Sequence, residues 1–191
     1  MSKVAIAAAL IPIAALVLTA CAEIPTTGEA QPSSASSPIS ADTSDTVEFS
    51  SADVTFAQQM LAHHEQAVAM TDVILAKDGI AAEVTDFALK VKAVHEPEAT
   101  QLTDWLIEWG ASSPEVATQE GAASAALVAA DGVDASRLFL DQMIAHHNRA
   151  IEMAKTERTE GVDTDAVFLA RWIVESRASD ILTMQRLLEA M

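Results

Sequence analysis

The sequence has one cysteine and few basic residues, and each shortage excludes a class of function. Because Cys21 is the only cysteine, no intrachain disulfide can form and thiolate metal chemistry inside the folded domain is excluded. The 191 residues include 11 Lys and Arg against 28 Asp and Glu, a net charge of -17. So acidic a chain repels phosphate backbones, and we expect no nucleic-acid partner. There is also no nucleophile motif and no glycine-rich phosphate loop, so we expect no enzyme activity.

The first 20 residues have the layout of a lipoprotein signal peptide. Lys3 gives a basic start, Val4–Leu18 is almost wholly apolar, and Leu18-Thr19-Ala20-Cys21 resembles a bacterial lipobox. The apolar run is short for a membrane span, which needs about 20 residues. We expect removal of residues 1–20 and lipidation of Cys21, which would anchor an exported domain to the bacterial cell membrane, facing the periplasm or the exterior. A retained anchor, or an ordinary signal peptide with a chance cysteine, is the alternative.

Residues 21–50 are expected to be a disordered tether, since they contain Pro25, Pro32, Pro38 and many Ser, Thr and Ala. Residues 51–191 are enough for one domain. Apolar residues recur there at helical spacing without strand-like alternation. The spacing predicts helices over about 51–77, 80–109, 134–158 and 163–189. Residues 111–132 are expected to form a crossover loop, with room for a short helical piece.

The chain contains one His-His segment twice. Phe56–Met70 reads FAQQMLAHHEQAVAM and Phe139–Met153 reads FLDQMIAHHNRAIEM, at an offset of 83. At 100° per residue, Met60 and His63 lie on the inner face of the first helix, and Met143 and His146 do so in the second copy. The neighbouring histidines, His64 and His147, fall at the edge of that face, either exposed or in a second site.

The second helix of each repeat carries a carboxylate on its inner face. At an offset of 82, Glu98 matches Asp180 and His95 matches Arg177. Buried carboxylates are costly unless they are paired or bound to a cation. Two amphipathic hairpins bury their apolar faces best by packing against each other, so we predict an all-α four-helix bundle of two duplicated helical hairpins. The symmetry would bring His63 near His146 and Glu98 near Asp180. We expect an ion pair between Arg177 and Asp180.

The segments MLAHHEQAVAM and MIAHHNRAIEMA, with EPEATQLTDWLIEWG after the first, resemble the bacterial "domain of unknown function 305" family over most of residues 49–191. The resemblance implies a ferritin-like four-helix bundle that is secreted or attached to the envelope, and some relatives are described as copper-binding periplasmic proteins. It carries the following candidate ligands onto this chain: Met60, His63, His64, Met70, Met143, His146, His147 and Met153, with Glu98, Asp180 and Met184 as weaker additions. His95 and Arg177 depart from the family's usual glutamine, which makes His95 an extra candidate ligand and Arg177 an obstacle to a cation.

Imidazole suits copper and zinc, whereas thioether selects Cu(I), so a mixed His/Met set favours copper over zinc. The opposing interpretation is that the methionines fill the core and that Glu98, Asp180 or a backbone carbonyl satisfies His63 and His146. We therefore expect an envelope lipoprotein that binds a metal ion, with copper as the expected cofactor, in sequestration or transfer. The alternative is a metal-free helical module that binds a protein partner or forms a homodimer. A ferritin-like oxidase is disfavoured because the chain has no Glu-x-x-His motif.

Overall fold

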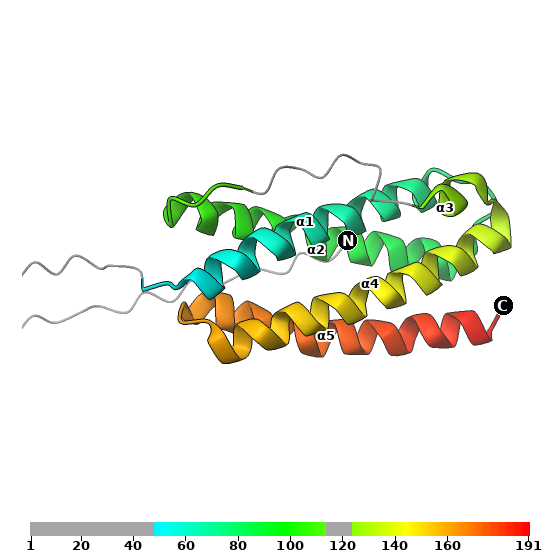
Figure 1. Ribbon diagram of the computed structural model, residues 1–191. Helices are drawn as coiled ribbons and strands as arrows, with labels where there is room; N and C mark the ends of the chain where they lie inside the picture. Colours follow the sequence, from blue (N-terminus) through cyan, green and yellow to red (C-terminus); the bar gives the residue numbers. More distant parts are fainter. Residues whose placement is uncertain (1–47, 114–123) are drawn as a thin grey trace, which may run out of the picture. The chain divides into compact units, whose positions relative to one another are not determined.

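The computed structural model describes residues 48–113 and 124–191. The signal peptide over 1–20, Cys21 and nearly all of the tether over 21–50 lie outside these residues and stay predictions. The described part of the chain is helical and has no strand, so the predicted all-α class is confirmed. Figure 1 shows its helices in chain order: α1 (Ser51–Leu75), α2 (Ala82–Glu108), α3 (Ala125–Ala129), α4 (Gly132–Glu160) and α5 (Thr164–Glu189).

The four long helices begin and end within two residues of the predicted positions, because the chain carries clear end signals. Ser50 caps α1 in a capping box: its hydroxyl accepts from the amides of Ala52 and Asp53, and the Asp53 carboxylate accepts from the Ser50 amide at 2.6 Å. At the end of α2, Gly110 takes φ +63°, and the Ala111 amide returns to the Leu106 carbonyl at 2.8 Å. This Schellman motif requires a left-handed residue, which glycine adopts without strain.

The helices are arranged as two hairpins. α1 packs along α2, α4 packs along α5, and α1 against α4 joins the two hairpins (Figure 1). The short helix α3, in the segment predicted as a crossover loop, packs mainly on α4. The predicted bundle of two helical hairpins is thus confirmed. None of the described helices is both long enough and apolar enough to cross a membrane.

Two apolar clusters fill the core, and a band of polar residues separates them. The first cluster is built around Phe56, Leu106 and Ile173, and the second around Ile74, Phe139 and Met184. Each long helix contributes residues to both clusters and two polar residues between them, a set that we call the polar layer: His63, His64, His95, Glu98, His146, His147, Arg177 and Asp180. The duplication therefore places a polar pair at the same height on every helix of the bundle.

Candidate metal centre

All eight side chains of the polar layer are buried, with exposed fractions from 0 to 8%. Histidine, carboxylate and guanidinium groups are rarely buried together, since each must lose its hydration. The layer contains all five histidines of the chain. In this part of the core, the hydration that the polar groups lose on burial must be replaced by hydrogen bonds, ion pairs or a bound ion.

His63 and His146 lie face to face at the junction of α1 and α4. Their ring centroids are 3.4 Å apart and the ring planes differ by 34°. All four of their ring nitrogens are buried without a hydrogen-bond partner. The prediction that the symmetry brings His63 near His146 is thus correct. The opposing interpretation, in which Glu98, Asp180 or a carbonyl satisfies these two rings, does not hold, because neither ring has a hydrogen-bond partner and both carboxylates bond elsewhere.

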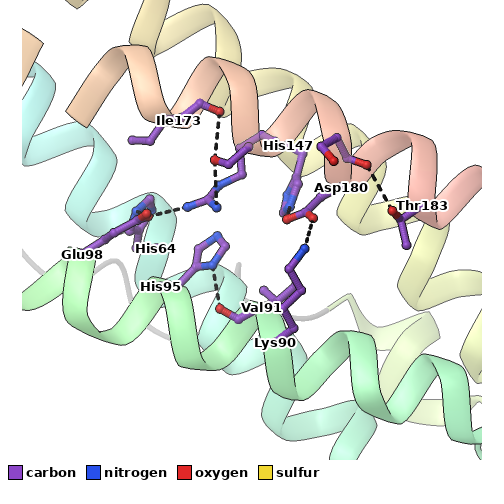
Figure 2. Close-up of polar contacts among 12 residues, drawn as sticks. His64, Lys90, Val91, His95, Glu98, His147, Ile173, Asp180 and Thr183 are labelled. Atoms are coloured by element: carbon purple, nitrogen blue, oxygen red, sulfur yellow. Dashed lines mark hydrogen bonds and ion pairs between the residues drawn. The ribbon is translucent and has the colours of Figure 1, made fainter. Parts of the chain in front are cut away.

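Of the other histidines, His64 and His95 are held by hydrogen bonds, whereas both ring nitrogens of His147 lack a hydrogen-bond partner. His64 Nε2 lies 2.7 Å from Glu98 Oε2, so the neutral ring donates through Nε2 and keeps a lone pair on Nδ1. His95 donates through Nδ1 to the Val91 carbonyl at 2.8 Å, which leaves the lone pair on Nε2 (Figure 2). His147 Nε2 is 3.7 Å from Asp180 Oδ2. The sequence placed His64 and His147 at the edge of the inner face, and the structure corrects this: both are completely buried.

The two carboxylates are each neutralised by a cation from the other hairpin. Arg177 on α5 donates to Glu98 on α2, and Lys90 on α2 donates to Asp180 on α5 at 2.5 Å (Figure 2). The predicted ion pair between Arg177 and Asp180 is therefore wrong. At i,i+3 on one helix the two side chains could meet, but the groups facing them across the bundle offer better partners. Glu98 and Asp180 occupy matching places but form separate pairs.

Burial dominates the protonation of the layer. It lowers the pKa of His63 to about 3, and the pKa values of His64, His95, His146 and His147 are also lowered, so all five rings are neutral near pH 7. Burial alone would raise the pKa of Glu98, but the hydrogen bond from His64 and the charge of Arg177 outweigh it, and the pKa is lowered. For Asp180, His147 and Lys90 outweigh burial in the same way and lower the pKa.

The candidate methionines fall into two groups. Met60 and Met143 are completely buried one turn before His63 and His146, Met60 in the first apolar cluster and Met143 in the second. The remaining three lie away from the polar layer. Met70 and Met184 belong to the second apolar cluster, whereas the partly buried Met153 packs on the first and lines an open pocket of about 510 Å³ between α1 and α4.

The polar layer pairs both of its carboxylates but leaves the rings of His63 and His146 without partners. Ring nitrogens without partners are the unusual feature, since buried polar groups are nearly always hydrogen-bonded. Within the described residues, however, no three His, Cys, Asp or Glu side chains converge as a ready-made cage. Two rings whose centroids lie only 3.4 Å apart leave no room for an ion between them, so coordination requires them to separate.

One member of the network was missed by the sequence interpretation. Lys90 lies outside the inner face of its helix, and its side chain is 56% exposed. Its role becomes visible only when α2 and α5 are placed side by side, since its partner Asp180 lies 90 residues away. No signal within its own helix distinguishes Lys90 from other surface lysines.

Fold and site together define a duplicated helical bundle with a buried histidine core. The family model described as "Domain of unknown function (DUF305)" matches residues 53–188, and the chain belongs to this family. The crystal structure of a DUF305 fragment from Deinococcus radiodurans is 28% identical with a TM-score of 0.66, over 74% of this chain and 98% of that one. A DUF305 protein from Streptomyces coelicolor, described as secreted, is 29% identical with a TM-score of 0.66, over 73% and 93%.

A third solved structure is the protein CopM in its Cu(I)-bound form. It is 26% identical to this chain with a TM-score of 0.62, over 72% of this chain and 96% of that one. A comparison with curated proteins finds no match. The likenesses therefore establish the family and the helical fold, and they include one relative solved with copper bound.

Proposed function

We propose that this protein binds copper as Cu(I) in its polar layer, with His63 and His146 as the central ligands. The observation that supports this most directly is the face-to-face pair of rings whose four nitrogens have no partner. A metal ion that accepts one lone pair from each ring would compensate for the hydrogen bonds that these nitrogens lack.

Met60 and Met143 complete the proposed ligand set. Each precedes its histidine by one turn, and the two belong to apolar clusters on opposite sides of the layer. Thioether sulfur is a soft, uncharged ligand that favours Cu(I) over Zn(II). His64 and His147 follow the central pair in sequence; Glu98 orients His64 by a hydrogen bond, and Asp180 lies 3.7 Å from His147.

The biological role that we propose is copper sequestration or transfer at the cell envelope, without catalysis. Export is supported by the signal-peptide layout of residues 1–20 and by the relative from Streptomyces coelicolor described as secreted. Lipidation of Cys21 would tether the domain to the membrane. The copper-bound CopM structure supports the choice of metal.

A second candidate function is a metal-free interaction module, and one observation favours it. Phe168 and Trp172 on α5 are 71% and 53% exposed. They line a pocket of about 490 Å³, and Trp172 also borders a second pocket of about 340 Å³. Large exposed aromatic side chains are typical of protein contacts, so this face offers a place for a partner whether or not the core holds copper.

Titration of the purified protein with Cu(I), Cu(II) and Zn(II) separates these functions. We expect Cu(I) to bind most tightly, and the double variant His63→Leu/His146→Leu to bind it at least 100-fold more weakly. Leucine keeps the volume of the core, so lost affinity is not a packing effect. The variant Met60→Leu/Met143→Leu should lose about tenfold or more, and Met184→Leu, a buried control outside the layer, should bind like the parent.

Heating with and without metal gives an independent measurement. An ion that binds only the folded state raises the midpoint of thermal unfolding. If the parent binds no metal and its unfolding is unaffected, the interaction module replaces the copper hypothesis. Unchanged affinity in the His63→Leu/His146→Leu variant would place the ligands elsewhere in the chain.

A further inference from the structure

The polar layer carries a balanced set of charges. Glu98 and Asp180 have lowered pKa values and are ionised, and Arg177 and Lys90 each neutralise one of them. A histidine binds a metal ion through a free ring lone pair, so the histidines enter the charge count as neutral groups. The formal charge of the layer with Lys90 is therefore zero before any ion enters.

The two cations are placed very differently. Arg177 is 1% exposed and is among the largest fully buried side chains of the protein, whereas the side chain of Lys90 is 56% exposed. Water screens the ammonium group of Lys90 but not the guanidinium of Arg177. Arg149 also lies near His63 and His146, but it is exposed on α4. Arg177 is thus the cation whose charge is felt most strongly inside the layer.

A fixed internal cation discriminates between metal ions by their charge. It repels a divalent ion with twice the Coulomb energy that it exerts on a monovalent ion at the same place. At roughly 10 Å and an effective dielectric constant of about 20, the extra repulsion corresponds to a factor on the order of tenfold in affinity. Removal of the Arg177 charge would therefore benefit Zn(II) and Cu(II) more than Cu(I).

We infer that Arg177 is a specificity-determining residue that keeps the charge of the polar layer balanced and so makes the site selective for a monovalent soft cation over divalent ions. The inference rests on the proposed copper function and adds a charge rule to its ligand set. Thioether sulfur selects Cu(I) by its softness, and the buried guanidinium of Arg177 selects it again by charge. The matching position on α2 holds the neutral His95, so only the second repeat supplies this charge.

The test measures dissociation constants for Cu(I) and Zn(II) in a series of variants with different layer charge. Arg177→Gln gives a charge of -1, Glu98→Gln gives +1, and the double variant Arg177→Gln/Glu98→Gln returns to zero. Glutamine can still hydrogen-bond at both positions. Arg149→Gln serves as the control, because it removes an exposed cation near the same histidines. Circular dichroism before each titration verifies that the variant is folded.

We expect the preference for Cu(I) over Zn(II) to fall about tenfold in Arg177→Gln, to rise in Glu98→Gln, and to return to the parent value in the double variant. Arg149→Gln should change it less than threefold. If Arg177→Gln does not fold, Glu98→Gln still tests the opposite charge. If the parent binds Cu(I) but Arg177→Gln and Glu98→Gln show the same preference for Cu(I) over Zn(II) as the parent, the role of the Arg177 charge is overturned and the proposed function is not. A parent that binds no Cu(I) would overturn the proposed function and this inference together.

Discussion

Replacing Glu157 by glutamine should stabilise the protein at neutral pH. Glu157 is 1% exposed near the end of α4, and neither oxygen of its carboxylate has a hydrogen-bond partner. Beside it, the Asp53 carboxylate accepts from the amides of Val162 and Asp163 at 3.0 Å. A proton on Glu157 supplies the donor that Asp53 can accept. Burial, followed by the hydrogen bond to Asp53 and the charges of Asp53 and Asp163, raises the pKa of Glu157 to about 8.

The raised pKa fixes the sign and the size of the effect. The folded state holds the proton more tightly than the unfolded chain, whose Glu157 titrates near 4.5. The stabilisation by Glu157 is complete below pH 4.5 and is lost as the pH rises through about 8. At about 1.4 kcal/mol per pH unit, the loss amounts to about 3 kcal/mol at pH 7 and at most about 5 kcal/mol above pH 8.

Urea unfolding at a series of pH values from 4 to 9 measures this difference. The Glu157→Gln variant, whose amide can donate to Asp53 without titrating, should become more stable than the parent by a margin that grows from pH 4.5 to 8. The histidines titrate equally in the parent and in Glu157→Gln, so their effect cancels in the difference between the two free energies of unfolding. Glu160→Gln, on the exposed side of the same helix end, should show no such trend. A constant difference across this range would mean that Glu157 ionises normally, and the reasoning would fail.

Two further predictions concern acid and Gly161. Because burial lowers the pKa of His63 to about 3, the metal-free protein should lose stability as the pH falls below about 6.5. The His63→Leu/His146→Leu variant should lose less, as measured by urea unfolding at pH 7 and 4.5. A Cβ at Gly161 would lie 2.3 Å from Glu157 Oε1 and 2.7 Å from the Glu157 backbone oxygen, so Gly161→Ala should destabilise by about 1–3 kcal/mol. An unchanged urea midpoint would show that the backbone at the end of α4 shifts without cost, and the prediction would fail.

The sequence predicted the fold well because its signals are local and repeated. Helical periodicity, the Ser50 cap and the stop at Gly110 each depend on neighbouring residues. The duplication then supplied the long-range information that a single helix lacks, since two copies of one amphipathic hairpin bury their faces best against each other. Seven of the eight polar-layer residues were candidate ligands, six through the family resemblance and His95 as a departure from it, and the eighth, Arg177, was noted as an obstacle.

Partner choice inside the layer could not be predicted from periodicity. Whether Glu98 meets His63 or His64 depends on a rotation of α1 smaller than the 100° between adjacent residues. The partners of Arg177 and Lys90 depend on how α2 and α5 face each other. Met70 and Met153 show the same limit: they match in sequence, but Met153 borders an open pocket and Met70 lies in the second apolar cluster.

The crossed ion pairs make the two halves of the duplication mutually dependent. Glu98 in the first hairpin relies on Arg177 of the second, and Asp180 relies on Lys90 of the first. A dimer of either hairpin with itself would have to form other pairs, Lys90 with a second Glu98 or Arg177 with a second Asp180, in place of those seen here. The two repeats therefore keep one backbone pattern but differ in their buried cations, so the ion pairs seen here form only when both hairpins are present.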